Sequence, residues 1–267
     1  MFVNRLISGI VLLILAAVTI ISGGMVWFLT LMLLSAIALL ELQQAQDVTM
    51  FPLGFLSYVF GFVYYIFLYL HWEEYHSLLI VLFFLALVLT YISVFPKCPA
   101  EKMTEIFFQP FYVVVMFSYL FRLRMMENGV YLIVLVFFSS WGCDTFAYCV
   151  GMILGKHPLV PKLSPKKSIE GAVGGIVGAA LLGGIYGFFL RDVVNFVPNQ
   201  AVFFAILCAL GAILSQMGDL LASGIKRNYG IKDYGNLIPG HGGILDRFDS
   251  MILIAPVLYY FSLYFLG

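Results

Sequence analysis

The sequence has little charge. Only 10% of its 267 residues are Asp, Glu, Lys or Arg, and the formal net charge is zero. Soluble globular proteins use about 25% charged residues, so this composition excludes an ordinary soluble domain. The four cysteines, Cys98, Cys143, Cys149 and Cys208, have no metal-ligand spacing, which argues against a cysteine metal site. Hydrophobic residues instead make up 63% of the chain, and we expect one integral membrane domain over residues 1–267.

Long apolar runs recur along the chain and predict an all-α, polytopic membrane protein. A helix needs about 20 apolar residues to cross the hydrocarbon core, and the sequence offers about nine such runs. We expect transmembrane helices at 6–21, 25–41, 51–70, 77–95, 105–121, 129–152, 170–190, 201–224 and 250–266. Residues 1–128 hold N-terminal spans without a motif, whereas residues 129–267 carry both polar loops and are expected to form the catalytic half.

The distribution of basic residues predicts a cytoplasmic N-terminus. With that orientation, 11 of the 14 Lys and Arg residues face the cytosol, as the positive-inside rule requires. Both polar loops, 153–169 and 225–249, then lie on the cytosolic side. We therefore expect an active site on that side of a membrane, which we take to be a bacterial inner (cytoplasmic) membrane.

Acids beside or inside apolar spans form the first candidate site. Asp219, Ser223 and Lys226 share one helical face, and Asp246 and Asp249 share another at the start of the last span. Carboxylate oxygens suit Mg²⁺, so the three acids are candidate metal ligands. The alternative is that Asp246 caps its helix and the other two acids form ion pairs.

A glycine-rich turn, Gly240-His241-Gly242-Gly243, precedes the last span. Such a turn brings backbone N–H groups close to an anion, although glycine turns also simply reverse the chain. We expect His241 to be a turn residue or a phosphate donor rather than a base. The neighbouring basic side chains favour a phosphate site: Lys226, Arg227, Lys232 and Arg247.

A second polar cluster follows the sixth span. Asp144 is an acid inside an apolar helix, and Lys166 and Lys167 lie in the loop after it. With free helix N–H groups, these cations are suited to a nucleoside triphosphate. Ser164-Pro165 fits a helix N-cap followed by proline, and Ser168 is a rival cap.

The polar segment from Ser223 to Asp249 resembles the motif of phosphatidate cytidylyltransferases, also called CDP-diacylglycerol synthases. It reads Ser223-x-x-Lys226-Arg227-x4-Lys232-Asp233-x-Gly235-x3-Pro239-x-His241-Gly-Gly-x-x-Asp246-Arg247-x-Asp249. The earlier cluster resembles the same family over Asp144-x-x-Ala147-Tyr148-x-x-Gly151-x3-Gly155-Lys156 and over Ser164-Pro165-Lys166-Lys167-Ser168-x-Glu170-Gly171. The first five spans match only in being hydrophobic.

The resemblance implies transfer of a cytidylyl group from CTP to phosphatidic acid, giving CDP-diacylglycerol and pyrophosphate for phospholipid biosynthesis. It also implies Mg²⁺, a second cation (K⁺ or Mg²⁺) and a homodimer within the lipid bilayer, and no nucleic-acid partner is expected. By motif position, the metal ligands are Asp219, Asp246 and Asp249.

The resemblance and the chemistry of the side chains together assign two sets of residues. The expected catalytic residues are Asp219, Lys226, Arg227, Asp246 and Arg247. The expected substrate-binding residues are Asp144, Lys166, Lys167, Ser223, Lys232, His241, Gly242 and Gly243. Asp144 is assigned either to a cation or to the cytosine amino group.

Two other classes of function compete with this interpretation. A CTP-using polyprenol or diacylglycerol kinase would move the γ-phosphate and release CDP instead of pyrophosphate. Acids in membrane helices also form ion or proton paths in transporters. The gathering of charge on the cytosolic side argues against a transporter.

Overall fold

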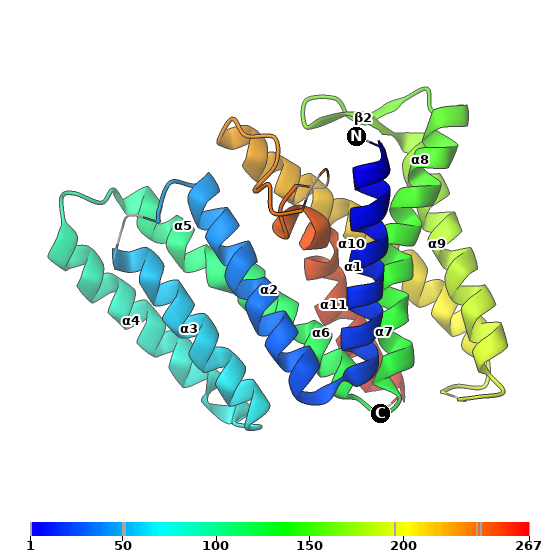
Figure 1. The fold of residues 1–267 in the computed structure, drawn as a ribbon, viewed down its shortest axis with the longest axis horizontal. Coiled ribbons are helices and arrows are strands. Elements are labelled where there is room, and N and C mark those ends of the chain that lie inside the picture. Colours follow the sequence, from blue (N-terminus) through cyan, green and yellow to red (C-terminus); the bar gives the residue numbers. More distant parts are fainter. Residues whose placement is uncertain (1, 50–51, 195, 239, 241, 267) are drawn as a thin grey trace. The chain divides into compact units, whose positions relative to one another are not determined.

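The computed structural model describes residues 2–49, 52–194, 196–238, 240 and 242–266, with side chains from residue 9 onward. Most of this part of the chain is helical (Figure 1). The helices are α1 (Phe2–Ser22), α2 (Gly24–Ala45), α3 (Pro52–Tyr69), α4 (His76–Val94), α5 (Ala100–Pro110), α6 (Met116–Met125), α7 (Gly129–Phe137), α8 (Cys143–Leu154), α9 (Ile169–Leu190), α10 (Gln200–Asn228) and α11 (Leu245–Leu266).

The all-α, polytopic membrane class is confirmed. Within the described residues, eight helical stretches are long and apolar enough to cross a membrane. Two of them are composites of two α-helices, because α5 and α6 join as Ala100–Met125 and α7 and α8 join as Gly129–Leu154. The described apolar part of α1 is shorter, Gly9–Ser22. A ninth span and the cytoplasmic N-terminus therefore stay predictions.

Each composite helix contains a short π-helical segment, η2 (Phe111–Val115) or η3 (Phe138–Gly142). Pro110 lies directly before η2, and its missing N–H group removes one donor from the α-helical ladder. In η3, an added Cβ on Gly142 would lie 2.7 Å from Leu182 Cδ1, so glycine permits close packing there.

A two-stranded antiparallel hairpin joins α8 to α9, with β1 (Pro158–Val160) and β2 (Ser164–Ser168). Helix α9 begins after Ser168, whose Oγ accepts a hydrogen bond from the N–H of Gly171 at 3.1 Å. The Ser168 cap is thus confirmed. The cap at Ser164-Pro165 is wrong, because both residues belong to an extended strand that pairs with β1.

Contacts divide the chain into two compact units. Unit 1 comprises Met1–Phe121 and Tyr229–Arg247, and unit 2 comprises Arg122–Asn228 and Phe248–Gly267. The motif segment 229–247 thus packs with the N-terminal helices, a grouping that the sequence did not predict. Helix α10 also runs beyond its predicted end at 224, and α11 starts five residues before its predicted start at 250.

Each unit has its own packing. In unit 1, Trp27 Nε1 donates to the carbonyl of Leu120 at 3.2 Å, and the rings of Phe28 and Tyr65 meet edge to face at 5.9 Å. In unit 2, α8 and α9 lie side by side (Figure 1). An added Cβ on Gly174 would lie 2.5 Å from Val150 Cβ, so glycine at this position permits close packing of α9 against α8.

Candidate active site

A cavity of 420 Å³ opens in unit 2 among α8, the hairpin, α9 and α10. Lys166 and Lys167 of β2 and Asp144 of α8 supply its charged lining. The α8 residues Tyr148 and Met152 also line it and are 70% and 67% exposed. The lysine pocket, as we call this cavity, thus combines two cations with accessible apolar surface.

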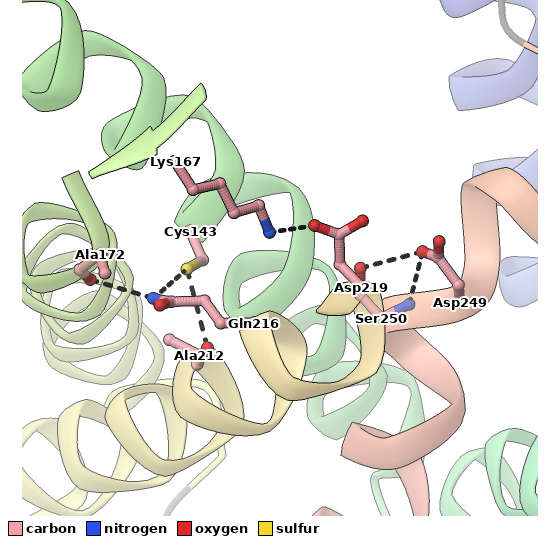
Figure 2. Close-up of polar contacts among 8 residues, drawn as sticks. All are labelled: Cys143, Lys167, Ala172, Ala212, Gln216, Asp219, Asp249 and Ser250. Carbon is pink, nitrogen blue, oxygen red and sulfur yellow. Dashed lines mark hydrogen bonds and ion pairs between the residues drawn. The ribbon is translucent and has the colours of Figure 1, made fainter. Parts of the chain in front are cut away.

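Asp219 stands on α10 and faces Lys167, whose amino group contacts Asp219 Oδ2 (Figure 2). One turn earlier, Gln216 Nε2 donates to the carbonyl of Ala172 at 3.0 Å and contacts the sulfur of Cys143 at 3.5 Å. These bonds tie this part of α10 to α9 and α8. The sequence-predicted residues Lys167 and Asp219 are therefore brought together.

Helix α10 approaches the start of α11 closely at Gly218. An added Cβ on Gly218 would lie 2.7 Å from the carbonyl oxygen of Asp249 and 3.1 Å from Ser250 Cα. The Asp249 side chain is buried, and its Oδ1 accepts from the N–H of Ser250 at 2.8 Å. Asp219 and Asp249 consequently stand on adjoining helices of unit 2 (Figure 2).

The end of α10 carries three more predicted site residues. Ser223 and Lys226 are partly exposed and Arg227 is exposed, all within the last turns of the helix. Cations at a helix C-terminus interact favourably with the helix dipole. The positions of Ser223 and Lys226 on α10 agree with the helical face predicted for them and Asp219, while the catalytic and substrate-binding roles of all three residues at the helix end stay predictions.

A second cavity, of 520 Å³, lies in unit 1 within the motif segment. Its lining includes four predicted or neighbouring polar positions, namely Lys232, Asp233, Asn236 and Arg247. Gly242 also lines it, with a φ of +82° that favours glycine. The structure thus brings Lys232, Gly242 and Arg247 together, whereas His241 lies outside the described residues.

Asp246 organises the same segment from the first turn of α11. Its Oδ2 accepts from the N–H of Tyr234 at 2.8 Å and from the N–H of Gly243 at 3.0 Å. The side chain is only 9% exposed. Both donors lie before α11, so these bonds hold the loop that precedes the helix and do not cap the helix itself. The metal role of Asp246 and the substrate role of Gly243 stay predictions.

Glu41 of α2 is a site residue that the sequence analysis missed. Its side chain is 5% exposed. Oε1 accepts from the N–H of Ile244 at 2.9 Å, and Oε2 accepts from the N–H of Leu245 at 2.8 Å. The sequence feature that could have identified Glu41 is an acid next to an apolar run, and the same feature identified Asp219.

Tyr229, at the start of the motif segment, is held by α5. Its hydroxyl donates to Glu105, which also forms an ion pair with Lys102 at 3.2 Å. Burial raises the pKa of Tyr229, and so do the hydrogen bond to Glu105 and the charge of Glu105. The tyrosine therefore serves as a neutral hydrogen-bond donor.

The hairpin of unit 2 is anchored by Glu170 in the first turn of α9. Oε2 accepts from the N–H groups of Lys156 and His157 at 3.1 and 3.3 Å, and Oε1 lies 2.6 Å from His157 Nδ1. The motif acid Glu170 therefore shapes the chain around Lys156 rather than facing the lysine pocket.

Among the described residues, no group of three or more His, Cys, Asp or Glu side chains is placed to hold a metal ion. Asp219 and Asp249 belong to unit 2, whereas Asp246 belongs to unit 1. The site formed by these three carboxylates therefore stays a prediction.

Known proteins resemble the chain over most of its length. The model of the cytidylyltransferase family matches residues 3–265. The phosphatidate cytidylyltransferase of Bacillus subtilis is 36% identical over 185 residues, which cover 68% of this chain and 66% of the relative. Those of Staphylococcus haemolyticus and Rickettsia bellii are 41% and 43% identical over 147 and 134 residues.

These two alignments cover 55% and 49% of this chain and 54% and 58% of the relatives. The matched part thus spans between 54% and 66% of the length of the three relatives. Because the family match extends over nearly the whole sequence, the chain belongs to the cytidylyltransferase family.

Proposed function

We propose that this membrane protein is a CTP:phosphatidate cytidylyltransferase of phospholipid biosynthesis. A phosphate oxygen of phosphatidic acid forms a bond to the α-phosphorus of CTP. The bond between the α-phosphorus and the bridging oxygen breaks, and pyrophosphate leaves. Membership of the cytidylyltransferase family and the names of three relatives support this assignment.

The observation that carries the proposal is the lysine pocket of unit 2. Phosphatidic acid combines a charged phosphate with long acyl chains. Lys166 and Lys167 offer point charges to the phosphate, and the exposed side chains of Tyr148 and Met152 offer apolar surface to the chains. A water-soluble phosphate monoester would use only the first part of this pocket.

The reaction does not need a strong general base. The second pKa of a phosphate monoester is about 6, so the attacking oxygen is largely ionised at neutral pH. The protein has to align the two substrates and offset their negative charge. We assign charge neutralisation to Lys226 and Arg227 of α10 and to Lys232 and Arg247 of the motif segment, where the guanidinium groups donate to phosphate oxygens in a fork.

We also propose Mg²⁺ as the cofactor, held by Asp219 and Asp249 together with Asp246. Carboxylates are the hard oxygen donors that Mg²⁺ takes, and Asp219 and Asp249 stand on adjoining helices of unit 2. A bound Mg²⁺ supplies neutralisation of charge on the reacting phosphates. A second cation, K⁺ or Mg²⁺, belongs to the same proposal.

The proposed enzyme is a homodimer in a bacterial inner membrane, with its active site facing the cytosol. The concentration of Lys and Arg in loops 153–169 and 225–249 supports that orientation. The relatives are bacterial, which supports the choice of membrane.

The decisive experiment incubates the detergent-purified protein with α-³²P-labelled CTP, phosphatidic acid and Mg²⁺. We expect label in the lipid phase, an equal amount of pyrophosphate and loss of both on chelation. Glycerol 3-phosphate, offered in place of phosphatidic acid, serves as the matched acceptor without acyl chains and should react poorly. Release of labelled CDP with unlabelled lipid would instead indicate a kinase.

A further inference from the structure

A buried carboxylate from the N-terminal helices reaches into the motif segment. Glu41, near the end of α2, is 5% exposed, and each of its oxygens accepts a different backbone N–H group at the start of α11. The donors are Ile244 at 2.9 Å and Leu245 at 2.8 Å. Glu41 therefore supplies, from about 200 residues away, the acceptors that a helix N-terminus lacks within the helix itself.

Two glycines of the motif segment leave the space that this carboxylate occupies. An added Cβ on Gly235 would lie 2.5 Å from Glu41 Oε1. An added Cβ on Gly243 would lie 2.5 Å from both Oε1 and Oε2. Any larger residue would collide with the carboxylate, so the close approach of Glu41 explains why these two positions are glycine.

Glu41 and Asp246 together hold four backbone donors of the segment. Asp246 takes the N–H groups of Tyr234 and Gly243, and Glu41 takes those of Ile244 and Leu245. A negative charge at the positive end of a helix is favourable, and a buried donor left without an acceptor is costly. The conformation of the segment thus depends on both carboxylates.

We propose that Glu41 is a positioning residue for the reaction, which fixes the motif segment so that Lys232, Asp246 and Arg247 keep their places. The inference rests on the proposed cytidylyl transfer, since it assigns a role within that reaction. Glu41 acts through the backbone of the segment and does not touch the substrates. Helix α2, which contains no recognised motif, consequently contributes to the reaction through this one contact.

A merely structural role for Glu41 makes a different prediction, and Gln43 provides the matched control. Gln43 is also buried in α2, and its Nε2 donates to the carbonyl of Gly54 at 3.0 Å. Replacing it removes a buried polar group from the same helix without changing a contact to the motif segment. Comparison of the two positions separates loss of general stability from loss of positioning.

The kinetic test compares Glu41→Ala, Glu41→Gln and Gln43→Ala in the full-length protein. We expect kcat to fall about 100-fold in Glu41→Ala, the loss that a shift of about 1 Å in catalytic groups can cause. Glu41→Gln keeps the side-chain volume and one acceptor oxygen, but its amide NH₂ faces the second backbone N–H group, so that two donors meet. Its kcat should therefore fall about 10-fold. In all three, KM for phosphatidic acid should stay within about twofold, because the lysine pocket lies in unit 2.

Gln43→Ala should lower the melting temperature and keep kcat within about twofold of wild type. The inference is overturned if Glu41→Ala retains wild-type kcat, or if the Glu41 variants and Gln43→Ala lose kcat in proportion to their loss of stability. If Glu41→Ala does not fold, Glu41→Gln carries the same comparison.

A double-mutant cycle tests the contact with Gly243 directly. Gly243→Ala should lower kcat by at least about 10-fold in the wild-type background, because its Cβ meets the Glu41 carboxylate. In the Glu41→Ala background the space is free, and the same change should add less than about twofold. If Gly243 is glycine only because substrate approaches its backbone, the loss will be equal in both backgrounds and the inference fails.

Hydrogen exchange separates this inference from the proposed function. In Glu41→Ala, amides in peptides covering residues 242–247 should exchange at least about 10-fold faster than in wild type, whereas Gln43→Ala should leave them unchanged. This readout needs no substrate. An inactive wild-type protein would overturn the proposed function, while unchanged exchange in Glu41→Ala beside an active wild-type protein would overturn the positioning role alone.

Discussion

The two polar segments of this membrane protein are held by different means. In unit 2, the hairpin of residues 158–168 has its own strand pairing, and Ser168 caps the helix that follows. In unit 1, the motif segment 229–247 has little regular structure, and the carboxylates of Glu41 and Asp246 take its backbone donors.

An acid in a sequence motif can therefore have a structural role instead of a catalytic one. Asp246 and Glu170 both accept backbone N–H groups and shape the chain around them. Asp219 instead faces the amino group of Lys167 beside the lysine pocket. Substitutions at these acids distinguish the two roles, because only a structural acid should change stability.

The largest expected effect concerns Asp219. Asp219→Asn should lower kcat by about 10²–10³-fold, the loss typical of removing one group that stabilises transition-state charge, because Asn lacks the charge of the carboxylate that we propose as a Mg²⁺ ligand. Its melting temperature should stay near wild type, because the pair with Lys167 is partly exposed at 29% for each side chain. The α-³²P assay and a thermal melt in detergent provide the measurements. Asp192→Asn, at an acid that is 83% exposed, is the control and should retain activity.

Near-normal turnover of the Asp219→Asn protein would remove Asp219 from the catalytic machinery. Loss of both turnover and stability would place Asp219 with the acids that shape the chain, and the contrast drawn with Asp246 would disappear.

Asp246 should show an effect on structure as well as on turnover. Asp246→Ala leaves the N–H groups of Tyr234 and Gly243 without their acceptor and should lower the free energy of opening the segment by about 1–3 kcal/mol. Asp246→Asn keeps an oxygen that accepts both bonds, because a single oxygen of Asp246 accepts them in the structure. The free energy of opening should therefore fall by less than half as much as in Asp246→Ala. Hydrogen exchange over residues 231–247 measures the difference, and equal exchange in the two variants would contradict it.

A substitution of Lys167 tests whether the lysine pocket binds the phosphate of phosphatidic acid. Lys167→Met should raise KM for phosphatidic acid about 10-fold, because a hydrogen bond to a charged group contributes about 1.5–3 kcal/mol. Lys162→Met removes an exposed charge outside the pocket lining and should leave KM unchanged. Steady-state kinetics in mixed micelles give the values. A rise of the same size in both variants would mean that the hairpin acts only through its overall charge.

The smallest effect is expected at the cap of α9. Ser168→Ala removes the acceptor of the Gly171 N–H group and should lower the free energy of unfolding by about 1 kcal/mol. Ser164→Ala is the matched control, since Ser164 lies in β2 and does not cap the helix. Denaturant unfolding of the two variants would decide between the caps, and a larger loss at Ser164 would contradict the structure.

Much of the fold could be predicted from the sequence, because long apolar runs can only be helices in a bilayer. The hairpin could not, since Ser164-Pro165-Lys166-Lys167-Ser168 has no alternating apolar pattern that would indicate a strand. The early start of α11 was missed for a related reason. Charges at Asp246, Arg247 and Asp249 interrupt the hydropathy, although the carboxylate of Glu41 supports the helix start.

The site was predicted unevenly. The residue types placed Lys166, Lys167 and Asp144 near one another, and the structure gathers them in one pocket. The partners of Glu41 lie about 200 residues away and are backbone groups, which carry no mark in the sequence. Local patterns thus reveal charged side chains but not the donors that orient them.

The π-helical segment Phe138–Gly142 changes the direction of the side chains that follow it in the sixth predicted span. An α-helix turns about 100° per residue, so the wider π turn shifts every following side chain around the axis by about one position. A helical wheel drawn without a break from Gly129 would therefore aim Asp144 away from the cavity that it lines. Deleting a single residue there would restore a regular helix in which Asp144 keeps its direction, so the π segment acts as one inserted residue.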